Sequence, residues 1–368
     1  MNKNESSYNS TMNKKFTYLL GAGASFNSIP ILEGQGKSMM QVANSLQIAI
    51  NDINLFPNSK SSKIFENEKL LNFKNNLFHF GKLANEYGSI DIYARRLSLL
   101  GNFTELNNLK YCLSVYFDLW ETFFGIKTIQ NESKKKYFDK IDKRYFSLLS
   151  VLLEKNDQKP KLNNNISFIS WNYDLQLEKA YSSFLPTNNN TLEVINSGIK
   201  FIDDESDQKQ DIIHLNGYRG EFKYENKRYP TVDINNQATL EDYLFQLLDN
   251  EDQFRKSELD YKECIKYAWE ADSILLKKAK KIMQETDVLI VIGYSFPSFN
   301  RKIDSMLIKA FEDNNRGRVI YQDPNANQDI INSIFSNPND VKIEKDNINQ
   351  FYIPHEFLYQ TDDKEVYV

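Results

Sequence analysis

The residues best suited to chemistry begin with a glycine-rich turn that follows the apolar run Phe16–Leu20. The members of this turn are Gly21, Ala22, Gly23, Ala24 and Ser25. An apolar run that stops at glycines is typical of a buried parallel strand leading into a tight turn. Such a turn lets the backbone come close to a phosphate and points free N–H groups at the anion. The pattern predicts a nucleotide-binding turn, and an ordinary strand-to-helix turn remains the alternative.

The spacing of these glycines argues against a dehydrogenase. The dinucleotide fingerprint of dehydrogenases is G-x-G-x-x-G, followed about 20 positions later by an acidic residue that binds the ribose. Here Phe26 occupies the position of the third glycine, and the stretch from Gly36 to Ile50 contains no acidic residue. If the turn binds a nucleotide, it therefore serves another kind of nucleotide chemistry, and the other motifs of the chain must show which.

Polar side chains follow the second apolar run, Ile166–Trp171, in the form of Asn172 and Asp174. Ligands of parallel sheets bind at the carboxyl ends of the strands, and a primary amide offers two donors and one acceptor there. We therefore expect Asn172 to contact a ligand. Asp174 either contacts the ligand as well or caps the helix that begins near Leu175.

A third run, Asp211–Leu215, contains His214 and is followed directly by Asn216 and Gly217. Side chains two positions apart in a strand share a face, so we expect His214 and Asn216 to point the same way. Imidazole titrates near neutral pH and can accept a proton. A purely structural histidine is the alternative.

Two later runs also end in residues that can bind a ligand. Val288–Gly293 stops at a second glycine turn that contains Ser295, so N–H groups or a hydroxyl are available there. Arg318–Gln322 leads into Asp323 and Asn325, whose acceptors suit ribose hydroxyls or adenine. A proline-containing turn at Pro324 is the alternative explanation.

The elements that must position these residues are strands separated by long stretches of helical patterning. That order is typical of an α/β fold, here a Rossmann-like parallel sheet with helices on both faces. Two gaps are too long for simple crossovers, and we expect large helical insertions at about 33–160 and 220–285 that form a cap or an oligomer interface. The first should contain two helices around Gly101, and the second a helix over Glu258–Met283.

The composition limits the partners of the chain. Its 368 residues are 41% hydrophobic, which suits a sizeable core, and 45 basic against 50 acidic residues give a formal charge of −5. This balance gives no general attraction to nucleic acid or to an anionic membrane. With no run of about 18 apolar residues and no apolar leader, we expect a cytoplasmic protein. A flexible tail over 1–13 should precede one domain over 14–368.

Two cysteines far apart in the chain and three histidines without ligand spacing predict neither a disulfide framework nor a zinc site. A set of short motifs follows in order along the chain, namely Gly21–Ser25, Ile29-Pro30, Ser89-Ile90-Asp91-x-Tyr93, Asn172-x-Asp174, His214-x-Asn216-Gly217, Gly293-x-Ser295 and Asp323-Pro324-Asn325. Together these motifs resemble the sirtuin-like NAD-binding fold, and more narrowly the zinc-free NAD hydrolases of prokaryotic anti-phage defence.

The chain departs from sirtuin deacylases in several places. It lacks their four-cysteine zinc module, carries Trp171 in place of their glutamine, and has Ile31 where they carry an aspartate. Their catalytic histidine lies directly before the glycine, a position that Asn216 occupies here. Either His214 takes that role from the same strand, or Asn216 works without an imidazole, and we favour His214.

The resemblance implies that the chain hydrolyses NAD+ to nicotinamide and linear or cyclic ADP-ribose, with NAD+ as substrate and no true cofactor. The turn Gly21–Ser25 would hold the pyrophosphate. The implied catalytic residues are Asn172, His214 and Asp174, and the implied binding residues of the remaining nucleotide are Asn216, Gly293, Ser295, Asp323 and Asn325.

The resemblance further implies regulation in abortive infection, through a homo-oligomer or a defence partner such as a HerA-like hexameric ATPase. Two other functions stay open. One is a non-catalytic regulatory subunit that binds NAD or ADP-ribose. The other, less favoured, is a sirtuin-type protein deacylase.

Overall fold

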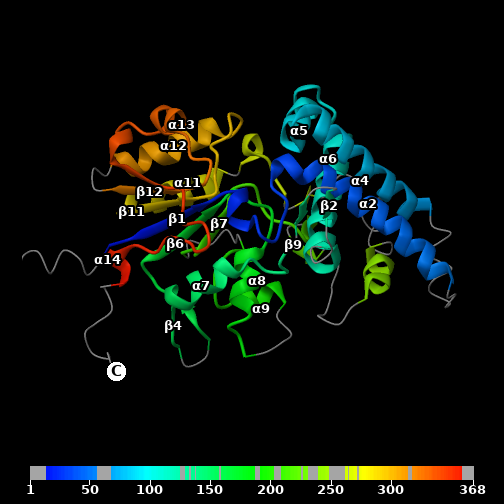
Figure 1. Ribbon diagram of the computed structural model, residues 1–368, viewed down its shortest axis with the longest axis horizontal. Helices are drawn as coiled ribbons and strands as arrows, with labels where there is room; N and C mark the ends of the chain where they lie inside the picture. The colour runs from blue at the N-terminus through cyan, green and yellow to red at the C-terminus, as the bar shows by residue number, and fades with distance from the viewer. Residues whose placement is uncertain are drawn as a thin grey trace, which may run out of the picture.

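The computed structural model describes residues 14–55, 68–124, 129–131, 134–136, 138–156, 159–186, 191–202, 209–224, 227–230, 239–247, 262–263, 265–271, 273–313 and 317–358. A six-stranded sheet in the order β13-β12-β11-β1-β6-β7 forms its centre (Figure 1). Each pairing is parallel, which confirms the predicted α/β fold. The strands are β1 (Phe16–Leu20), β6 (Ile166–Ser170), β7 (Ile212–His214), β11 (Val288–Ile292), β12 (Arg318–Gln322) and β13 (Val341–Glu344).

The strand order reverses between β1 and β11, because the chain adds β6 and β7 on one side of β1 and later strands on the other. In open α/β sheets, ligands bind outside the carboxyl ends of the strands at such a point. The register brings three strand ends level, since Leu20 pairs with both Ser170 and Ile292. The residues that follow these three strands therefore start side by side.

Helices cover both faces of the sheet (Figure 1). Side chains of β1 alternate between the two layers, so that Tyr18 packs on one face and Leu19 on the other. One layer consists of α7 (Lys143–Leu152), α8 (Gln176–Ser182), α9 (Leu192–Asn196) and α14 (His355–Leu358). The other consists of α11 (Ser273–Glu285), α12 (Arg301–Glu312) and α13 (Gln328–Ile334).

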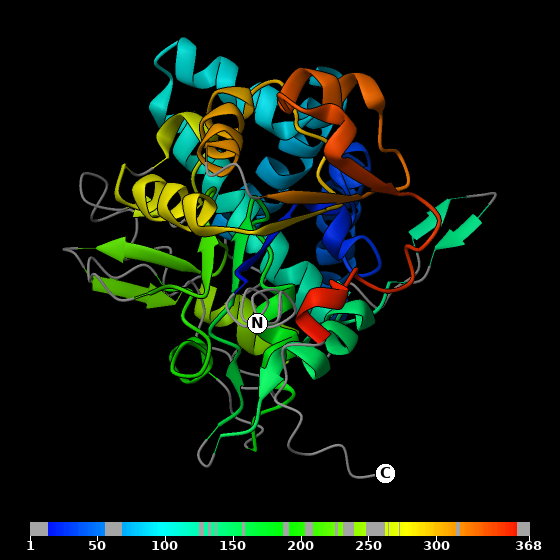
Figure 2. The same cartoon turned by 90° about the vertical axis from the view of Figure 1, so that its left-hand side faces the viewer.

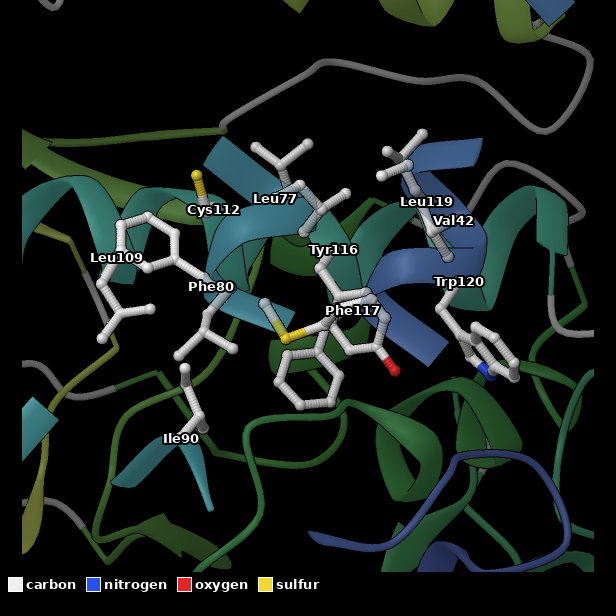
Figure 3. Close-up of a cluster of buried hydrophobic side chains, with 14 of the residues drawn as sticks. Val42, Leu77, Phe80, Ile90, Leu109, Cys112, Tyr116, Phe117, Leu119 and Trp120 are labelled. Atoms are coloured by element: carbon white, nitrogen blue, oxygen red, sulfur yellow. The ribbon is translucent and has the colours of Figure 1, made fainter. Parts of the chain in front are cut away.

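A helical lobe stands beside the sheet and has its own core, part of which Figure 3 shows. Its helices are α2 (Leu32–Leu55), α4 (Glu68–Tyr87), α5 (Ile90–Leu99), α6 (Phe103–Leu119) and the π-helical turn η2 (Trp120–Phe124). Leu77 of α4 and Tyr116 of α6 are both fully buried in this core. The two helices predicted around Gly101 are α5 and α6, which confirms that prediction.

The insertions differ in detail from the expectation. Within 33–160, α7 packs on the sheet rather than in the lobe. The prediction of one helix over Glu258–Met283 is wrong, because the described residues there form the strand β10 (Lys262–Glu263) and the 3-10 helix η3 (Ala268–Glu270) before α11 begins at Ser273. The apolar residues that suggested this helix belong to two cores, since Tyr267 packs in the lobe while Leu275 packs on the sheet.

The remaining elements are short. Figure 2 shows the β2–β3 hairpin projecting away from the sheet. Within the described ranges, no helix is both long and apolar enough to cross a membrane, and the predicted tail over 1–13 lies outside those ranges. The short elements are η1 (Ala22–Ser25), β2 (Ile129–Asn131), β3 (Lys134–Lys136), β4 (Leu153–Glu154), β5 (Lys161–Leu162), β8 (Glu221–Tyr224), β9 (Lys227–Pro230), a helix over 240–247, β10 (Lys262–Glu263), η3 (Ala268–Glu270) and η4 (Pro338–Asp340).

Candidate functional site

A pocket lies at the carboxyl ends of β1, β6, β7 and β11, where the helical lobe faces the edge of the sheet. It encloses about 690 Å³ when its open mouth is included. Aromatic side chains form much of its wall, namely Phe117, Trp171, Tyr173, Tyr294 and Phe299. Its polar side chains are Gln35, Asp91, Asn172, Asp174, Asn216, Ser295 and Asn300. The pocket thus occupies the position where the strand order reverses.

The glycine turn packs tightly against the loop that follows β11. A Cβ on Gly21 would lie 2.5 Å from Tyr294 Cα, and one on Gly23 would lie 2.7 Å from Gly293 Cα. Gly293 itself has a φ of +58°, which side-chain-bearing residues rarely adopt. These glycines are therefore required because the two loops pack so closely. Their spacing in the sequence does not reveal this requirement.

The N–H groups of the turn are largely used within the protein. Gly21 N–H donates to Ile292 O (3.0 Å), Gly23 N–H to Gly293 O (2.9 Å) and Ala24 N–H to Gly21 O (2.9 Å). Among the five residues predicted to hold a pyrophosphate, Ala22 lines the pocket. Ala22 is therefore the residue of the turn that a ligand in the pocket would contact, while the hydrogen bonds of Gly21, Gly23 and Ala24 fix the shape of the loop.

Arg144 of α7 supports this turn from behind. Its buried guanidinium donates to Gly23 O (3.1 Å) and Ala24 O (3.2 Å), and Asp142 neutralises it at 2.6 Å. The guanidinium also lies over the ring of Phe351, 4.7 Å from the ring centroid. Arg144 thus binds the carbonyl side of the turn, a role that the sequence does not indicate.

Asn172 is held in one orientation at the end of β6. Its Nδ2 donates to Gly21 O at 3.0 Å, and its side chain is 7% exposed. A main-chain carbonyl can only accept a hydrogen bond, so the amide nitrogen must face Gly21. The Oδ1 atom is left for a ligand of the pocket that Asn172 lines.

Asp174 lies both at the start of α8 and in the wall of the pocket. Its Oδ1 accepts from the N–H of Gln176 (3.1 Å), at the start of α8, and from Ser25 Oγ (3.0 Å). Burial raises the pKa of Asp174 to about 7, the charge of Glu121 adds to this rise, and the two hydrogen bonds oppose it. Asp174 also lines the pocket, so it can exchange a proton there near neutral pH.

Asp91 is a second pocket carboxyl, and it comes from the helical lobe. It lies in the first turn of α5, which Ser89 caps, and it accepts from Tyr173 OH at 3.0 Å. Burial raises the pKa of Asp91 to about 6, partly offset by the bond from Tyr173. The motif Ser89-Ile90-Asp91 contains this residue, but no pattern in the sequence places it in the same pocket as Asn172.

His214 lies behind Asn172 and does not belong to the lining of the pocket. Its Nε2 lies 2.7 Å from Glu178 Oε1, and its Nδ1 lies 3.3 Å from Asn172 O. Burial alone would lower the pKa of His214, but the charge of Glu178 and the hydrogen bonds to Glu178 and Asn172 raise it above its usual value. As folded, His214 contacts the pocket residue Asn172 through the main-chain carbonyl of Asn172.

The structure separates His214 from Asn216, which were expected to share a face. The strand β7 ends at His214, so Asn216 lies in the following turn and lines the pocket, with Nδ2 on Trp171 O at 3.2 Å. Gly293 and Ser295 line the pocket as well.

Asp323 and Asn325 lie outside the lining of the pocket. Asp323 Oδ1 accepts from the N–H of Asn325 at 2.7 Å, which closes the turn after β12. This bond agrees with the alternative of a local turn and leaves the predicted adenosine contact without support from the pocket.

A tyrosine, an asparagine and an aspartate form a buried chain beside the pocket. Tyr294 OH donates to the carboxylate of Asp304 (2.9 and 3.0 Å) and accepts from Asn300 Nδ2 (2.9 Å). Burial raises the pKa of Asp304 to about 7. The ring of Tyr294 stacks on Trp171 with centroids 6.0 Å apart. Neither Tyr294 nor Asn300 was predicted as a ligand contact. Asn300 was missed because it has the sequence pattern of a helix cap.

A buried charge network joins the lobe to the sheet. Arg219, which follows β7, binds Asp118 of α6 (2.5 Å) and Glu121 of η2. Glu121 also accepts from Gln176 Nε2 at 2.6 Å and lies 3.6 Å from Lys179 Nζ. Burial would raise the pKa of Glu121, but the charges of Arg219 and Lys179 and the hydrogen bonds lower it. This network fixes the lobe over the pocket.

The donor set does not suit a metal. Within the described part of the chain, no group of three or more His, Cys, Asp and Glu side chains is arranged to hold a metal ion.

Comparisons with known proteins find structural likeness only. The chain matches no protein-family model and no curated protein. A sirtuin structure solved to explain substrate affinity shares 12% identity and a TM-score of 0.39, over 95% of this chain and 94% of that chain. A structure of Sir2 with the inhibitor EX-527, 2'-O-acetyl-ADP-ribose and a deacetylated p53 peptide shares 12% identity and a TM-score of 0.38, over 94% of each chain. A Sir2 structure with a propionylated peptide shares 12% identity and a TM-score of 0.35, over 94% of this chain and 93% of that chain. All three are sirtuin structures, and at this identity and TM-score the likeness assigns no role to any residue here.

Proposed function

We propose that this protein is an NAD+ glycohydrolase that cleaves the bond between nicotinamide and ribose. The observation that carries the proposal is the fixed amide of Asn172, which is locked on Gly21 O and presents its oxygen in a pocket rich in acceptors. Cleavage of this bond develops positive charge on the ribose, and preorganised acceptors stabilise that charge.

Two residues of the pocket have separate roles in the reaction. Asn172 orients the attacking water or a ribose hydroxyl, and Asp174 accepts the proton that is released. Asp174 takes this part in place of His214 because it lines the pocket. His214 then acts as a positioning residue that holds the main chain of Asn172. Little acid catalysis is needed, since nicotinamide leaves as a neutral molecule.

The nucleotide spans the mouth of the pocket in this proposal. Ala22 meets the pyrophosphate, and Ser295, which is exposed at the rim, meets the adenosine half. The products are nicotinamide and ADP-ribose. Depletion of NAD+ in anti-phage abortive infection, within a homo-oligomer or beside a HerA-like hexameric ATPase, is the cellular role that we propose with it.

The test is to incubate the purified full-length chain with NAD+, alone and with candidate partners, and to follow nicotinamide and ADP-ribose by chromatography. An acyl-lysine peptide with NAD+ is assayed in parallel, because transfer of the acyl group would identify a deacylase. Binding of NAD+ by thermal shift without any turnover would identify a regulatory subunit. Release of nicotinamide without a peptide supports the hydrolase.

A further inference from the structure

The most exposed large apolar side chains of the described chain gather where α5 meets α6. Leu99, Leu100 and Phe103 keep 70%, 64% and 61% of their surface exposed. Ile92, which lies two turns before Leu99 on the same face of α5, is 46% exposed. Figure 1 shows α5 at the upper edge of the helical lobe. We call these four residues the α5–α6 corner.

The exposed apolar surface is concentrated on the lobe. Among the described residues, twelve large apolar side chains are exposed, and seven of them lie on α4, α5, α6 or the segments that join these helices. Single exposed apolar side chains are ordinary on a protein surface. At its exposed fractions the α5–α6 corner presents about 450 Å², a patch of the size that is often functional on a monomer. We therefore expect a partner to cover this corner.

Two arginines lie within this surface and set a condition on the partner. Arg95 and Arg96 are both exposed on α5. The guanidinium of Arg95 lies over the ring of Trp269, 5.1 Å from its centroid, and that of Arg96 lies over the ring of Tyr87 at 5.9 Å. Within the described part of the chain these ring contacts hold the two groups, and no carboxylate pairs with them. A partner that covers the corner must therefore bring carboxylates, because a buried charge without a pair is costly.

A second copy of this chain brings such a carboxylate to the same place. Glu105 lies in the first turn of α6, two residues after Phe103, and accepts from Asn102 Nδ2 at 2.7 Å and from Tyr93 OH. A carboxylate offers about four acceptor sites, so it can accept further N–H donors. In an isologous dimer each copy uses the same surface, so the arginines of one copy can meet Glu105 of the partner subunit.

The area of the corner also suits a second copy. Two corners that meet, together with their polar rims, would bury about 1,000 Å² in total, which is the lower limit of a specific interface. An interface of this size gives a weak dimer that forms and dissociates with protein concentration. No further surface of the chain is needed to reach that limit.

The corner and the pocket share the first turn of α5. Asp91 faces inward, is buried, and accepts from Tyr173 OH at 3.0 Å, while the next residue, Ile92, faces outward. A contact that holds Ile92 and Leu99 therefore also holds the turn that brings Asp91 to the pocket.

We propose that the α5–α6 corner binds the same corner of a second copy of this chain, and that this contact steadies α5 and, with it, Asp91. The dimer itself does not depend on the proposed function. Its effect on turnover rests on that function, because Asp91 lines the pocket.

The first experiment is sedimentation velocity of the full-length chain. We expect the sedimentation coefficient to rise from the monomer toward the dimer between about 1 and 100 µM protein. Leu100→Arg places like charges opposite one another in the dimer and should move this rise to at least about tenfold higher protein concentration. Val151→Arg is the matched control, because Val151 is an exposed apolar residue of α7, away from the lobe. A wild type that stays monomeric over this range, or an equal effect of the two variants, would overturn the proposal.

A second variant identifies the surface without disturbing the dimer. Leu100→Cys should be joined between copies by a short bifunctional maleimide, because residues near the two-fold axis of an isologous pair lie close to their own counterparts. The wild type, treated in the same way, reports any joining through the native cysteines. Joining that is no greater in Leu100→Cys than in Val151→Cys would overturn the proposal.

Turnover separates the two proposals. The rate of nicotinamide release per mole of chain should rise with protein concentration over the range in which the wild type dimerises, and Leu100→Arg should remain at the monomer rate. A dimer with no turnover would reject the hydrolase and keep the corner as an interface. Turnover by a protein that is monomeric at every concentration would keep the hydrolase and reject the dimer.

Discussion

His214 contacts Asn172 and Glu178 with its two ring nitrogens, so its influence on a ligand passes through Asn172. We predict that His214→Gln, which keeps a donor for Glu178, retains NAD+ turnover within about tenfold of the wild type. His214→Ala leaves a buried carboxylate unpaired and should lower the free energy of unfolding by about 3–5 kcal/mol. Nicotinamide release and urea unfolding measure the two effects. A folded His214→Gln protein without turnover would show that the imidazole itself reacts.

Asp91 and Asp174 give the reaction a pH dependence. Burial raises their pKa values to about 6 and about 7, so both carboxyls gain charge as the pH rises through that range. Because the charged forms stabilise a cationic transition state, kcat/KM should increase from pH 5 to pH 8, and Asp91→Asn should flatten the lower part of the profile.

The same ionisations act on stability with the opposite sign. A folded-state pKa above the unfolded value contributes stability that is complete below the unfolded pKa and is lost as the pH rises through the folded pKa. The kcat/KM profile must therefore be accompanied by circular dichroism at each pH, which shows whether the protein is still folded. A kcat/KM that falls steadily from pH 5 to pH 8 in folded protein would contradict the assignment.

Asn172 and Asp174 were correctly predicted to follow the carboxyl end of a buried strand, because an apolar run followed by polar residues marks such an end. The sequence could not place Asp91, Gln35 or Asn300. Their positions depend on how the helical lobe and α12 approach the sheet, and no local pattern in the sequence encodes that approach. His214 was predicted to act on the ligand because it was expected to share a strand face with Asn216, but β7 ends at His214.

At the scale of elements, the contact between the turn after β1 and the loop after β11 shapes the part of the pocket that Ala22 and Gly293 line. We predict that Gly293→Ala lowers the free energy of unfolding by more than about 2 kcal/mol, because its Cβ would lie 2.4 Å from Gly23 C at a φ of +58°. Gly101→Ala is the control, since Gly101 has a φ of +68° but no neighbouring atom closer than 4.0 Å. Chemical denaturation compares them, and equal losses would show that the loop contact is unimportant.

The strands were the most predictable elements. Runs such as Val288–Ile292 are buried on both faces of a parallel sheet, so continuous apolar sequence marks them. The helix expected over Glu258–Met283 was not predictable in the same way. Helical periodicity shows which residues are apolar, but it does not show that Tyr267 and Leu275 belong to different cores.

At the scale of the whole molecule, the site exists only while the lobe stays on the sheet. We predict that Glu121→Ala, which leaves Arg219 buried with one partner fewer, lowers the free energy of unfolding by about 3–5 kcal/mol and weakens nucleotide binding. Glu86→Ala removes an exposed pair with Lys82 and should change stability by less than about 0.5 kcal/mol. Urea unfolding and calorimetry measure both, and full binding by a destabilised Glu121→Ala protein would mean that the network does not hold the site together.

The most direct measurement of the central claim is the rate of nicotinamide release from NAD+ by the wild-type chain and by Asn172→Ala. We predict release by the wild type, alone or with a candidate partner, and a loss of at least about 100-fold in the variant, while the melting temperature of the variant confirms that it remains folded. Equal rates in the two proteins, or no release by the wild type under any condition, would contradict it.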